Sequence, residues 1–373
     1  MCIYDNGTQV RMGVTKGSMV LTALTASLSL FGSAAIIITF ILWREIRTTS
    51  RYILVFISIA DFLTSGGNLF GAIVPDHIIN GYDVCAVQSL VTTSSCLSFI
   101  MWTIILALYL YLSIVRGKVQ PSYEMKYVWV VFGWVIPLTV TIFAYLLNVL
   151  GDDKSAASAG WCWLNEEPEF PREIKCSQAR LMWSLLTGKG WEIPSYFIVP
   201  ILYFKVKRHI SNESRTTRHT LVTAQSMHAA QLVNRKLAFV PMAYVLLRMW
   251  GSVRYIFDIA GVDDVIYRDR RWLYNVFLCL QAIGDNGQGF ANFILFCIFT
   301  KSVRNKILGK FIYSCCMVKR ESPETLPILR SQRRHDTRRT KSDLPRKPSG
   351  DKDRMATVNI ETQVSLSHSD SIP

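Results

Sequence analysis

The sequence predicts an all-α integral membrane protein, a seven-transmembrane-helix bundle with a short amphipathic eighth helix. Half of the 373 residues are apolar, only 18% are charged, and the mean hydropathy is positive. The apolar residues are gathered in blocks instead of recurring at helix or strand period. Seven windows of about 20 apolar residues can be counted, each long enough to cross ~30 Å of hydrocarbon.

The seven spans define the predicted domain organisation. They are expected at residues 19–43, 52–74, 85–115, 127–150, 181–204, 237–260 and 272–300. Residues 1–18 form a short extracellular N-terminus and residues 19–300 the bundle. The first span is too long for the apolar region of a cleavable signal peptide, so we expect it to stay as a signal anchor. The third span contains a polar run from Thr92 to Ser95, which we expect to face the bundle because it would be costly against lipid.

The loops predict the orientation in the membrane. Basic residues are concentrated after the first, third and fifth spans, whereas acidic residues are concentrated in the opposite set of loops. The positive-inside rule therefore places the N-terminus outside and the C-terminus in the cytosol of a multi-pass plasma-membrane protein. Asn6 begins an Asn-Gly-Thr sequon on the outer side and is the expected glycosylation site.

The segment after the seventh span predicts contact with the inner leaflet. Apolar residues at positions 303, 307, 308, 311 and 312 form one stripe of a helix over residues 301–316, with basic residues opposite, suited to lying on membrane lipid. Cys315 and Cys316 are candidates for acylation, and the alternative is two unmodified thiols. Residues 317–373 are polar, so we expect a disordered cytoplasmic tail. The tail offers accessible sites to kinases and arrestin.

Four cysteines, Cys2, Cys85, Cys162 and Cys176, lie where an oxidising exterior could reach them. Cys85 begins the third span, and Cys162 lies in an outer loop between Trp161 and Trp163. A disulfide between Cys85 and Cys162 would tie this loop over the mouth of the bundle, with Trp161 and Trp163 as a candidate lid. Cys176 is a competing partner for either cysteine.

Ionisable residues inside the spans are the candidate site. Each costs roughly 2.5–3.5 kcal/mol at the bilayer centre, so it needs a partner or a function. Lys189 and Glu192 are three residues apart, on one face of the fifth span, and can neutralise each other. We expect a polar pocket or a hydrogen-bonded switch between helices, and the alternative is that these groups only fix helix packing. The full candidate set is Asp61, Lys189, Glu192, Arg248 and Asp285.

Several function classes are disfavoured. The sequence has no metalloprotease, nucleophile-elbow or phosphate-loop motif, so we expect no enzyme, no catalytic residues and no cofactor. Cys162 and the six scattered histidines have no metal-ligand spacing. The net charge is +14, and the basic residues lie mostly between the apolar blocks and in the tail. This distribution argues against a nucleic-acid-binding protein. The alternative to a receptor is a seven-span transporter or channel that uses the candidate charged set as an ion path.

Five short motifs, in order and each at the correct span, resemble secretin- and adhesion-type receptors. They are Leu108-Tyr-Leu-Tyr-Leu-Ser113, Gly133-Trp-Val-Ile-Pro137, Cys162-Trp163, Arg235-Lys236-Leu237 with Pro241, and Gln288-Gly289-Phe290. Because about 18 residues precede the first span, we expect no hormone-binding or adhesion ectodomain, and in this the sequence is similar to the cyclic-AMP-receptor-like branch related to the secretin family. Residues 107–116, 160–163 and 185–192 are most similar to an orphan receptor of that branch. No Asp/Glu-Arg-Tyr triplet ends the third span, which argues against a rhodopsin-type receptor.

The resemblance implies a G-protein-coupled receptor whose extracellular ligand is unknown. Such a ligand would bind in the outer half of the bundle, beneath Trp161 and Trp163. The fifth and sixth helices would then part on the cytosolic side and accept a heterotrimeric G protein. The resemblance favours phospholipase C and calcium signalling, with cyclic-AMP signalling as the rival. The candidate G-protein contacts are Arg116, Lys205, Arg208, Arg235 and Lys236.

Overall fold

The computed structural model describes residues 16–73, 78–79, 82–116, 123–151, 161–165, 176–216, 239–300 and 303–305. All of them belong to the first of two compact units, Met1–Ser314, and the second unit is Cys315–Pro373. Several predictions therefore concern residues outside the described ranges and stay predictions. These are glycosylation at Asn6, the contacts of Arg235 and Lys236, the eighth helix beyond residue 305, acylation of Cys315 and Cys316, and the tail.

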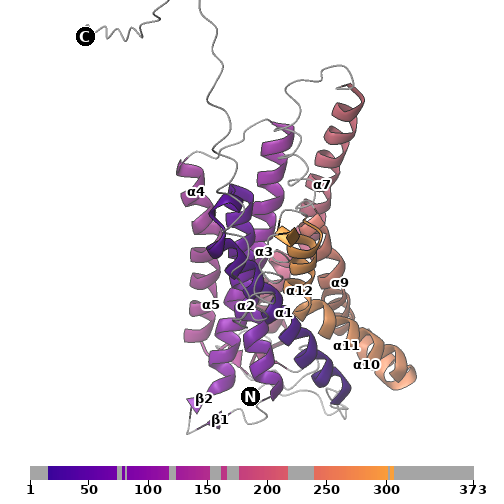
Figure 1. Cartoon of the computed structure of the whole chain (residues 1–373). Helices are drawn as coiled ribbons and strands as arrows, with labels where there is room; N and C mark the ends of the chain where they lie inside the picture. The colour runs from indigo at the N-terminus through magenta and orange to yellow at the C-terminus, as the bar shows by residue number, and fades with distance from the viewer. Residues whose placement is uncertain are drawn as a thin grey trace, which may run out of the picture. The chain divides into compact units, whose positions relative to one another are not determined.

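Within the described residues, a helical region lies at each of the seven predicted spans (Figure 1). The first three are the single helices α1 (Lys16–Leu42), α2 (Thr49–Ile73) and α3 (Val84–Val115), with a 3₁₀ turn η1 (Arg44–Ile46) between the first two. The fourth consists of α4 (Tyr123–Val130), the π-helical turn η2 (Val131–Val135) and α5 (Ile136–Leu146). The fifth consists of α6 (Cys176–Ser184), the π-helical turn η3 (Leu185–Lys189) and α7 (Gly190–Thr216). The sixth is α9 (Phe239–Ile259), and the seventh consists of α11 (Arg271–Asn286), α12 (Gln288–Phe293) and the π-helical turn η5 (Ile294–Ile298).

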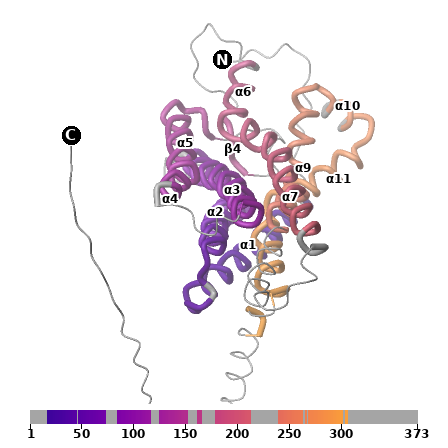
Figure 2. The backbone as a smooth tube through the Cα atoms, turned by 90° about the horizontal axis from the view of Figure 1, so that it is seen from above, coloured from indigo at the N-terminus to yellow at the C-terminus, as the bar shows by residue number. Residues whose placement is uncertain are grey.

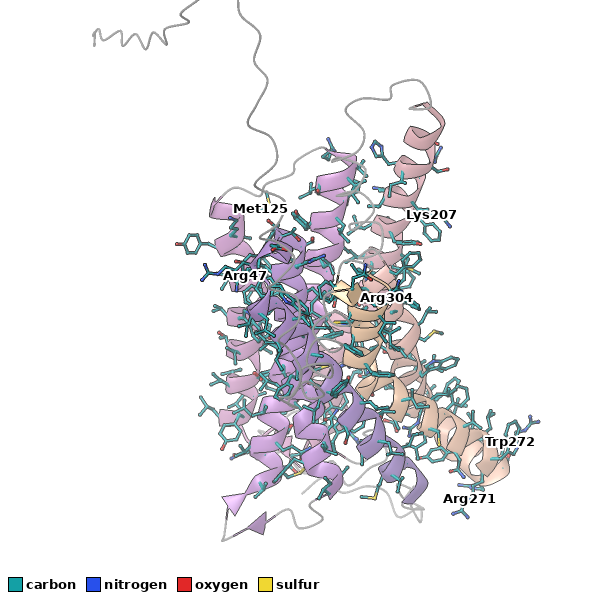
Figure 3. All side chains as sticks on the ribbon, in the orientation of Figure 1. Arg47, Met125, Lys207, Arg271, Trp272 and Arg304 are labelled. Carbon is teal, nitrogen blue, oxygen red and sulfur yellow. A yellow bond between two sulfur atoms is a disulfide. The ribbon has the colours of Figure 1, made fainter. Side chains whose placement is uncertain are left out.

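Short elements join the helices at one end of the bundle. The helix α10 (Val262–Asp269) lies between α9 and α11 in a connection that we expected to be a loop. Two antiparallel ladders lie at this end, β1 (Ile78–Ile79) with β2 (Tyr82–Asp83), and β3 (Leu150–Gly151) with β4 (Trp163–Leu164). We call it the disulfide end, because Cys85 and Cys162 also lie there. Figure 3 shows Arg271 and Trp272 at the disulfide end and Lys207 near the opposite end.

The bundle presents apolar side chains outward along the first, fourth and fifth helical regions. Phe31, Phe132 and Phe197, for example, are each at least half exposed. Of the described helices, α1, α2, α3 and the Met125–Leu146 region are long and apolar enough to cross a membrane by length and composition. The fifth, sixth and seventh regions instead contain the buried charges described below.

Helix α3 lies in the middle of the bundle and packs against α2, α5, α7 and α9, as Figure 2 shows from above for the first three. Its Trp102 stacks on Phe56 of α2, with 4.6 Å between ring centroids, and lies 6.4 Å from Trp134. Gly133 makes this packing possible, because a Cβ at Gly133 would overlap the Trp102 indole. The Gly-Trp pair of the fourth span therefore has a packing role.

The polar run of α3 faces the interior, as predicted. Thr92, Thr93, Ser94 and Ser95 are all buried. Their hydroxyls mostly donate to carbonyl oxygens one turn back, and Thr64 of α2 donates to Ser95 Oγ at 2.9 Å. In a bilayer such internal partners replace the water that these groups would otherwise need.

The predicted disulfide between Cys85 and Cys162 is confirmed, so Cys176 is not the partner of either cysteine. The bond joins the start of α3 to the segment that contains β4. Ser89 of α3 also donates a hydrogen bond to the Trp163 carbonyl oxygen. Leu150 and Leu164 of the β3–β4 ladder pack on Trp183 of α6 in a buried apolar cluster. The segment is thus held against α3 and α6.

Helices α9 and α11 approach each other closely at a glycine, which gives a first prediction. A Cβ at Gly284 would overlap the Leu247 carbonyl oxygen and lie 2.9 Å from its carbon. We expect Gly284→Ala to destabilise the protein by about 1–3 kcal/mol, because the backbone of α9 must move. Gly66→Ala is the matched control, since its Cβ would meet only Leu30 Cδ2 at 3.7 Å. Thermal unfolding of both variants in lipid nanodiscs checks this, and equal Tm values would contradict the account.

The disulfide gives a second prediction. It closes a sequence separation of 77 residues. In the chain-entropy model such a cross-link stabilises the folded state by up to about 4.5 kcal/mol, and strain lowers this value. We therefore expect Cys162→Ser to lower the Tm, and Cys279→Ser, which removes a free thiol, to leave it nearly unchanged. Equal Tm values for the two variants would show that the bond does not stabilise the fold.

Candidate functional site

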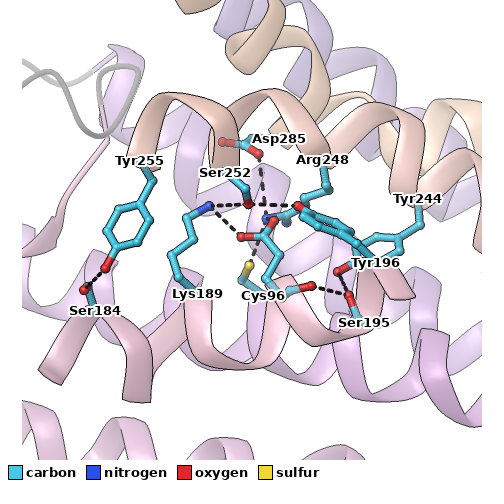
Figure 4. A network of polar contacts seen from close by, with 11 residues as sticks. Cys96, Ser184, Lys189, Ser195, Tyr196, Tyr244, Arg248, Ser252, Tyr255 and Asp285 are labelled. Carbon is cyan, nitrogen blue, oxygen red and sulfur yellow. Dashed lines mark hydrogen bonds and ion pairs between the residues drawn. The ribbon is translucent and has the colours of Figure 1, made fainter. Parts of the chain in front are cut away.

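Four of the five predicted intramembrane charges, Lys189, Glu192, Arg248 and Asp285, lie together, and Figure 4 labels the first, third and fourth of them. Lys189 is the last residue of the π-helical turn η3, and Glu192 lies in the first turn of α7. Arg248 comes from α9 and Asp285 from α11. Their side chains are only 12%, 3%, 8% and 9% exposed, respectively.

Lys189 and Glu192 form a direct ion pair. The distance from Lys189 Nζ to Glu192 Oε2 is 2.5 Å, as the three-residue spacing predicts. The same ammonium lies 3.3 Å from Ser252 Oγ of α9 and 5.9 Å from the centroid of the Tyr255 ring. The pair therefore connects the fifth and sixth helical regions.

Arg248 lies between two carboxylates from different helices. Its Nη1 is 3.8 Å from both Glu192 Oε1 and Asp285 Oδ1, which is ion-pair distance but longer than a hydrogen bond. The same nitrogen lies 3.1 Å from Cys96 Sγ, and the guanidinium carbon is 5.6 Å from the Phe99 ring centroid. Arg248 thus links α3, α7, α9 and α11.

The four charges balance, with two cations and two carboxylates. Removing one member would leave an uncompensated charge in a buried site, which typically costs 3–5 kcal/mol. Balance alone explains how these residues are tolerated inside a membrane protein. It does not require them to bind a ligand, so the function of the cluster depends on the space beside it.

A cavity of about 80 Å³ lies beside the charges. All four charged side chains line it, and so do Trp161 and Trp163 from the segment held by the disulfide. The volume exceeds that needed for a single water molecule. The remaining lining residues are mainly polar: Thr64, Asn68, Thr92, Thr93, Cys96, Cys162, Thr187, Gly188 and Gln281.

The π-helical turn η3 contributes three consecutive lining residues, Thr187, Gly188 and Lys189. A π-helical turn inserts an extra residue and shifts the side chains that follow it around the helix axis, and such turns are frequent at functional sites. Neither this turn nor the contributions of Asn68 and Gln281 were expected. The signal in the sequence was the presence of amides in apolar spans, but it does not tell which face of a helix points to a cavity.

Hydroxyl groups extend the network from the cavity toward the core of the bundle. Tyr196 OH lies 3.0 Å from Ser252 Oγ, and Ser195 Oγ lies 2.7 Å from Tyr244 OH (Figure 4). Both contacts join α7 to α9. Tyr244 packs on Phe99 of α3 in the main apolar cluster. The contact between α7 and α9 therefore continues from the cavity into the centre of the bundle.

Asp61, the fifth predicted member of the set, does not line the cavity. It is buried beside α1, where Ser33 and Ser29 donate hydrogen bonds to its Oδ2 at 2.8 and 3.3 Å. The Gly289 amide donates to Ser29 Oγ at 2.7 Å, so the carboxylate is linked to α12 as well. Asp61 lies outside the cavity because α2 presents it to α1 and not to α7 or α9.

Two further charged residues of α9 differ in their surroundings, and Asp258 is exposed. Arg254 is 3% exposed and hydrogen-bonds to Gln281 and Tyr274 of α11. Near the opposite end of the bundle, the candidate G-protein contacts Arg116, Lys205 and Arg208 are all exposed. Lys205 Nζ also lies 5.7 Å from the Tyr111 ring centroid of α3.

Comparison with known proteins agrees with the fold. The chain matches the family model "Slime mold cyclic AMP receptor" over residues 9–172. It resembles the crystal structure of squid rhodopsin with a TM-score of 0.57 and 14% identity, covering 80% of this chain and 86% of that one. This likeness shows the fold alone and confirms the predicted seven-transmembrane class.

The sequence relatives are more specific. The chain is 32% identical to G-protein coupled receptor 157 of Mus musculus over 311 residues, which are 82% of this chain and 87% of the mouse protein. It is 31% identical to the Homo sapiens receptor of the same name over 292 residues, covering 77% and 82% of the two chains. The chain is therefore a multi-pass membrane receptor of the G-protein coupled receptor 157 family, related to the slime mold cyclic AMP receptors.

Proposed function

We propose that this receptor binds an extracellular stimulus in the charged cavity and transmits it to a heterotrimeric G protein at the opposite end. The observation that carries the proposal is that Arg248 of α9 is held by Glu192 of α7 and Asp285 of α11 at the wall of a cavity. A ligand that enters this cavity acts directly on the contacts that hold three helices together.

The switch has a simple physical form. A ligand that pairs with Arg248, Glu192 or Asp285 competes with the contacts between α7, α9 and α11, and so changes the relative energy of two arrangements of α9. About 3 kcal/mol of differential binding changes the ratio of two states more than a hundredfold. Prolines inside α7, Pro194 and Pro200, and Pro241 near the start of α9 are positions where these helices can bend.

The orientation and the signalling branch belong to the proposal as well. The disulfide end faces the exterior of the plasma membrane. The opposite end, where the basic residues Arg116, Lys205 and Arg208 lie, faces the cytosol, in agreement with the positive-inside rule. Opening between α7 and α9 would admit the C-terminal helix of a Gα subunit to a groove bordered by Arg116, Lys205 and Arg208. The resemblance of the sequence favours phospholipase C and calcium as the output over cyclic AMP.

Charge reversal at the cytosolic end tests the proposed contact. We expect Arg116→Glu with Arg208→Glu to reduce stimulus-free second-messenger production at least tenfold, because truncating charged contacts at an interface costs about 2 kcal/mol or more. Both side chains are exposed, so the fold is expected to tolerate the change. Calcium and cyclic-AMP reporters in transfected cells, at matched surface expression, measure the effect and show which branch is used.

The matched control reverses two exposed arginines at the disulfide end, Arg268→Glu with Arg270→Glu. It changes the net charge by the same amount and should leave the signal unaltered. Equal signals from the two double variants would count against the proposed G-protein contact. A signal that is absent from the unaltered receptor with every Gα subunit would count against G-protein activation itself.

A further inference from the structure

The charged cavity contains polar atoms of both signs that have no hydrogen-bond partner. Glu192 Oε1, Asp285 Oδ1 and Arg248 Nε are fully buried, and none of the three makes a hydrogen bond within the described part of the chain. Buried polar groups in proteins are almost always satisfied, and leaving one unsatisfied is costly. Residues that line the cavity thus carry two carboxylate acceptors and a guanidinium donor without partners, which a ligand that displaces the Arg248 pairs would meet.

Charge balance limits the ligand further. The four charged lining residues sum to zero, so a ligand with a net charge would leave a buried site with an uncompensated charge. A ligand with one positive and one negative group keeps the sum at zero. It also places a donor against each unsatisfied carboxylate oxygen and an acceptor against Arg248.

The distances limit the spacing of the two ligand charges. Arg248 Nη1 is 3.8 Å from both Glu192 Oε1 and Asp285 Oδ1. The guanidinium donor and the two carboxylate acceptors therefore lie within a few ångströms of one another. An ammonium and a carboxylate on the same or on neighbouring carbon atoms match this spacing. Trp161 and Trp163 line the same cavity and offer the ligand an apolar surface and a cation–π contact.

We infer that the cavity binds a small zwitterion, a free amino acid. Its ammonium lies between Glu192 and Asp285, and its carboxylate accepts hydrogen bonds from Arg248 and Lys189. Binding converts the loose Arg248 pairs, which join α9 to α7 and α11, into pairs with the ligand. The inference rests on the proposed function only in taking this cavity as the stimulus site, because amino acid binding itself requires no G protein.

The test uses the full chain, purified in lipid nanodiscs, and its thermal unfolding followed by tryptophan fluorescence. The probes are the twenty proteinogenic amino acids and β-alanine, each at millimolar concentration. We expect at least one of them to raise the Tm by about 3 °C or more at roughly tenfold excess over its Kd. The methyl ester of that amino acid, which keeps only the positive charge, and its N-acetyl derivative, which keeps only the negative charge, should not raise the Tm.

Asp285→Asn tests the ammonium contact. We expect it to weaken binding of the active amino acid at least about 30-fold, because it removes one charge of a buried pair. Asp258→Asn is the matched control, since Asp258 is exposed on the same side of the bundle, and should leave the affinity unchanged. The comparison with the ester and N-acetyl derivative uses the unaltered chain, so it decides the question even if Asp285→Asn does not fold.

Three outcomes would overturn the inference. The first is that no amino acid raises the Tm, which points to water alone in the cavity. The second and third are that the methyl ester or the N-acetyl derivative raises the Tm as much as the amino acid does. Nucleotide exchange on added G protein is measured on the same preparation, with and without the amino acids. Exchange without amino acid binding defeats the inference and leaves the proposed function standing. Amino acid binding without exchange defeats the proposed function and leaves the inference standing.

Discussion

The guanidinium of Arg248 between the carboxylates of Glu192 and Asp285 is the interaction on which the arrangement of the bundle near the disulfide end depends. A single buried charge would be very costly at this depth, and two opposite charges on one helix would not connect different helices. Here the charges come from the fifth, sixth and seventh helical regions. Their neutralisation therefore requires these regions to lie side by side, and the Ser252, Tyr196 and Tyr244 hydroxyls carry the same contact inward.

The rest of the bundle keeps this charged centre small and accessible. Close packing of α9 on α11 at Gly284 brings the two helices near enough for Arg248 to reach Asp285. The disulfide at Cys162 holds Trp161 and Trp163 over the cavity without filling it. The buried carboxylate of Asp61 lies apart, satisfied by serine hydroxyls of α1, and shows that this chain handles a buried charge in two different ways.

Much of the fold could be predicted from the sequence, because length and hydropathy determine where helices cross a bilayer. The Lys189–Glu192 pair was also predictable, since it depends only on spacing along one helix. The pairing of Arg248 with two other helices was not predictable, because it depends on how each helix is rotated about its axis. The same reason explains why the place of Asp61 outside the cavity, and those of Asn68 and Gln281 at its wall, were not expected.

A double-mutant cycle between Arg248 and Asp285 tests the central claim most directly. The Tm of the full chain in nanodiscs is measured for Arg248→Gln, for Asp285→Asn and for both together. If charge balance holds the helices together, each single variant lowers the Tm strongly, and the double variant, which is again neutral, lowers it by much less than the sum. A double variant whose loss equals the sum of the two single losses would contradict the account.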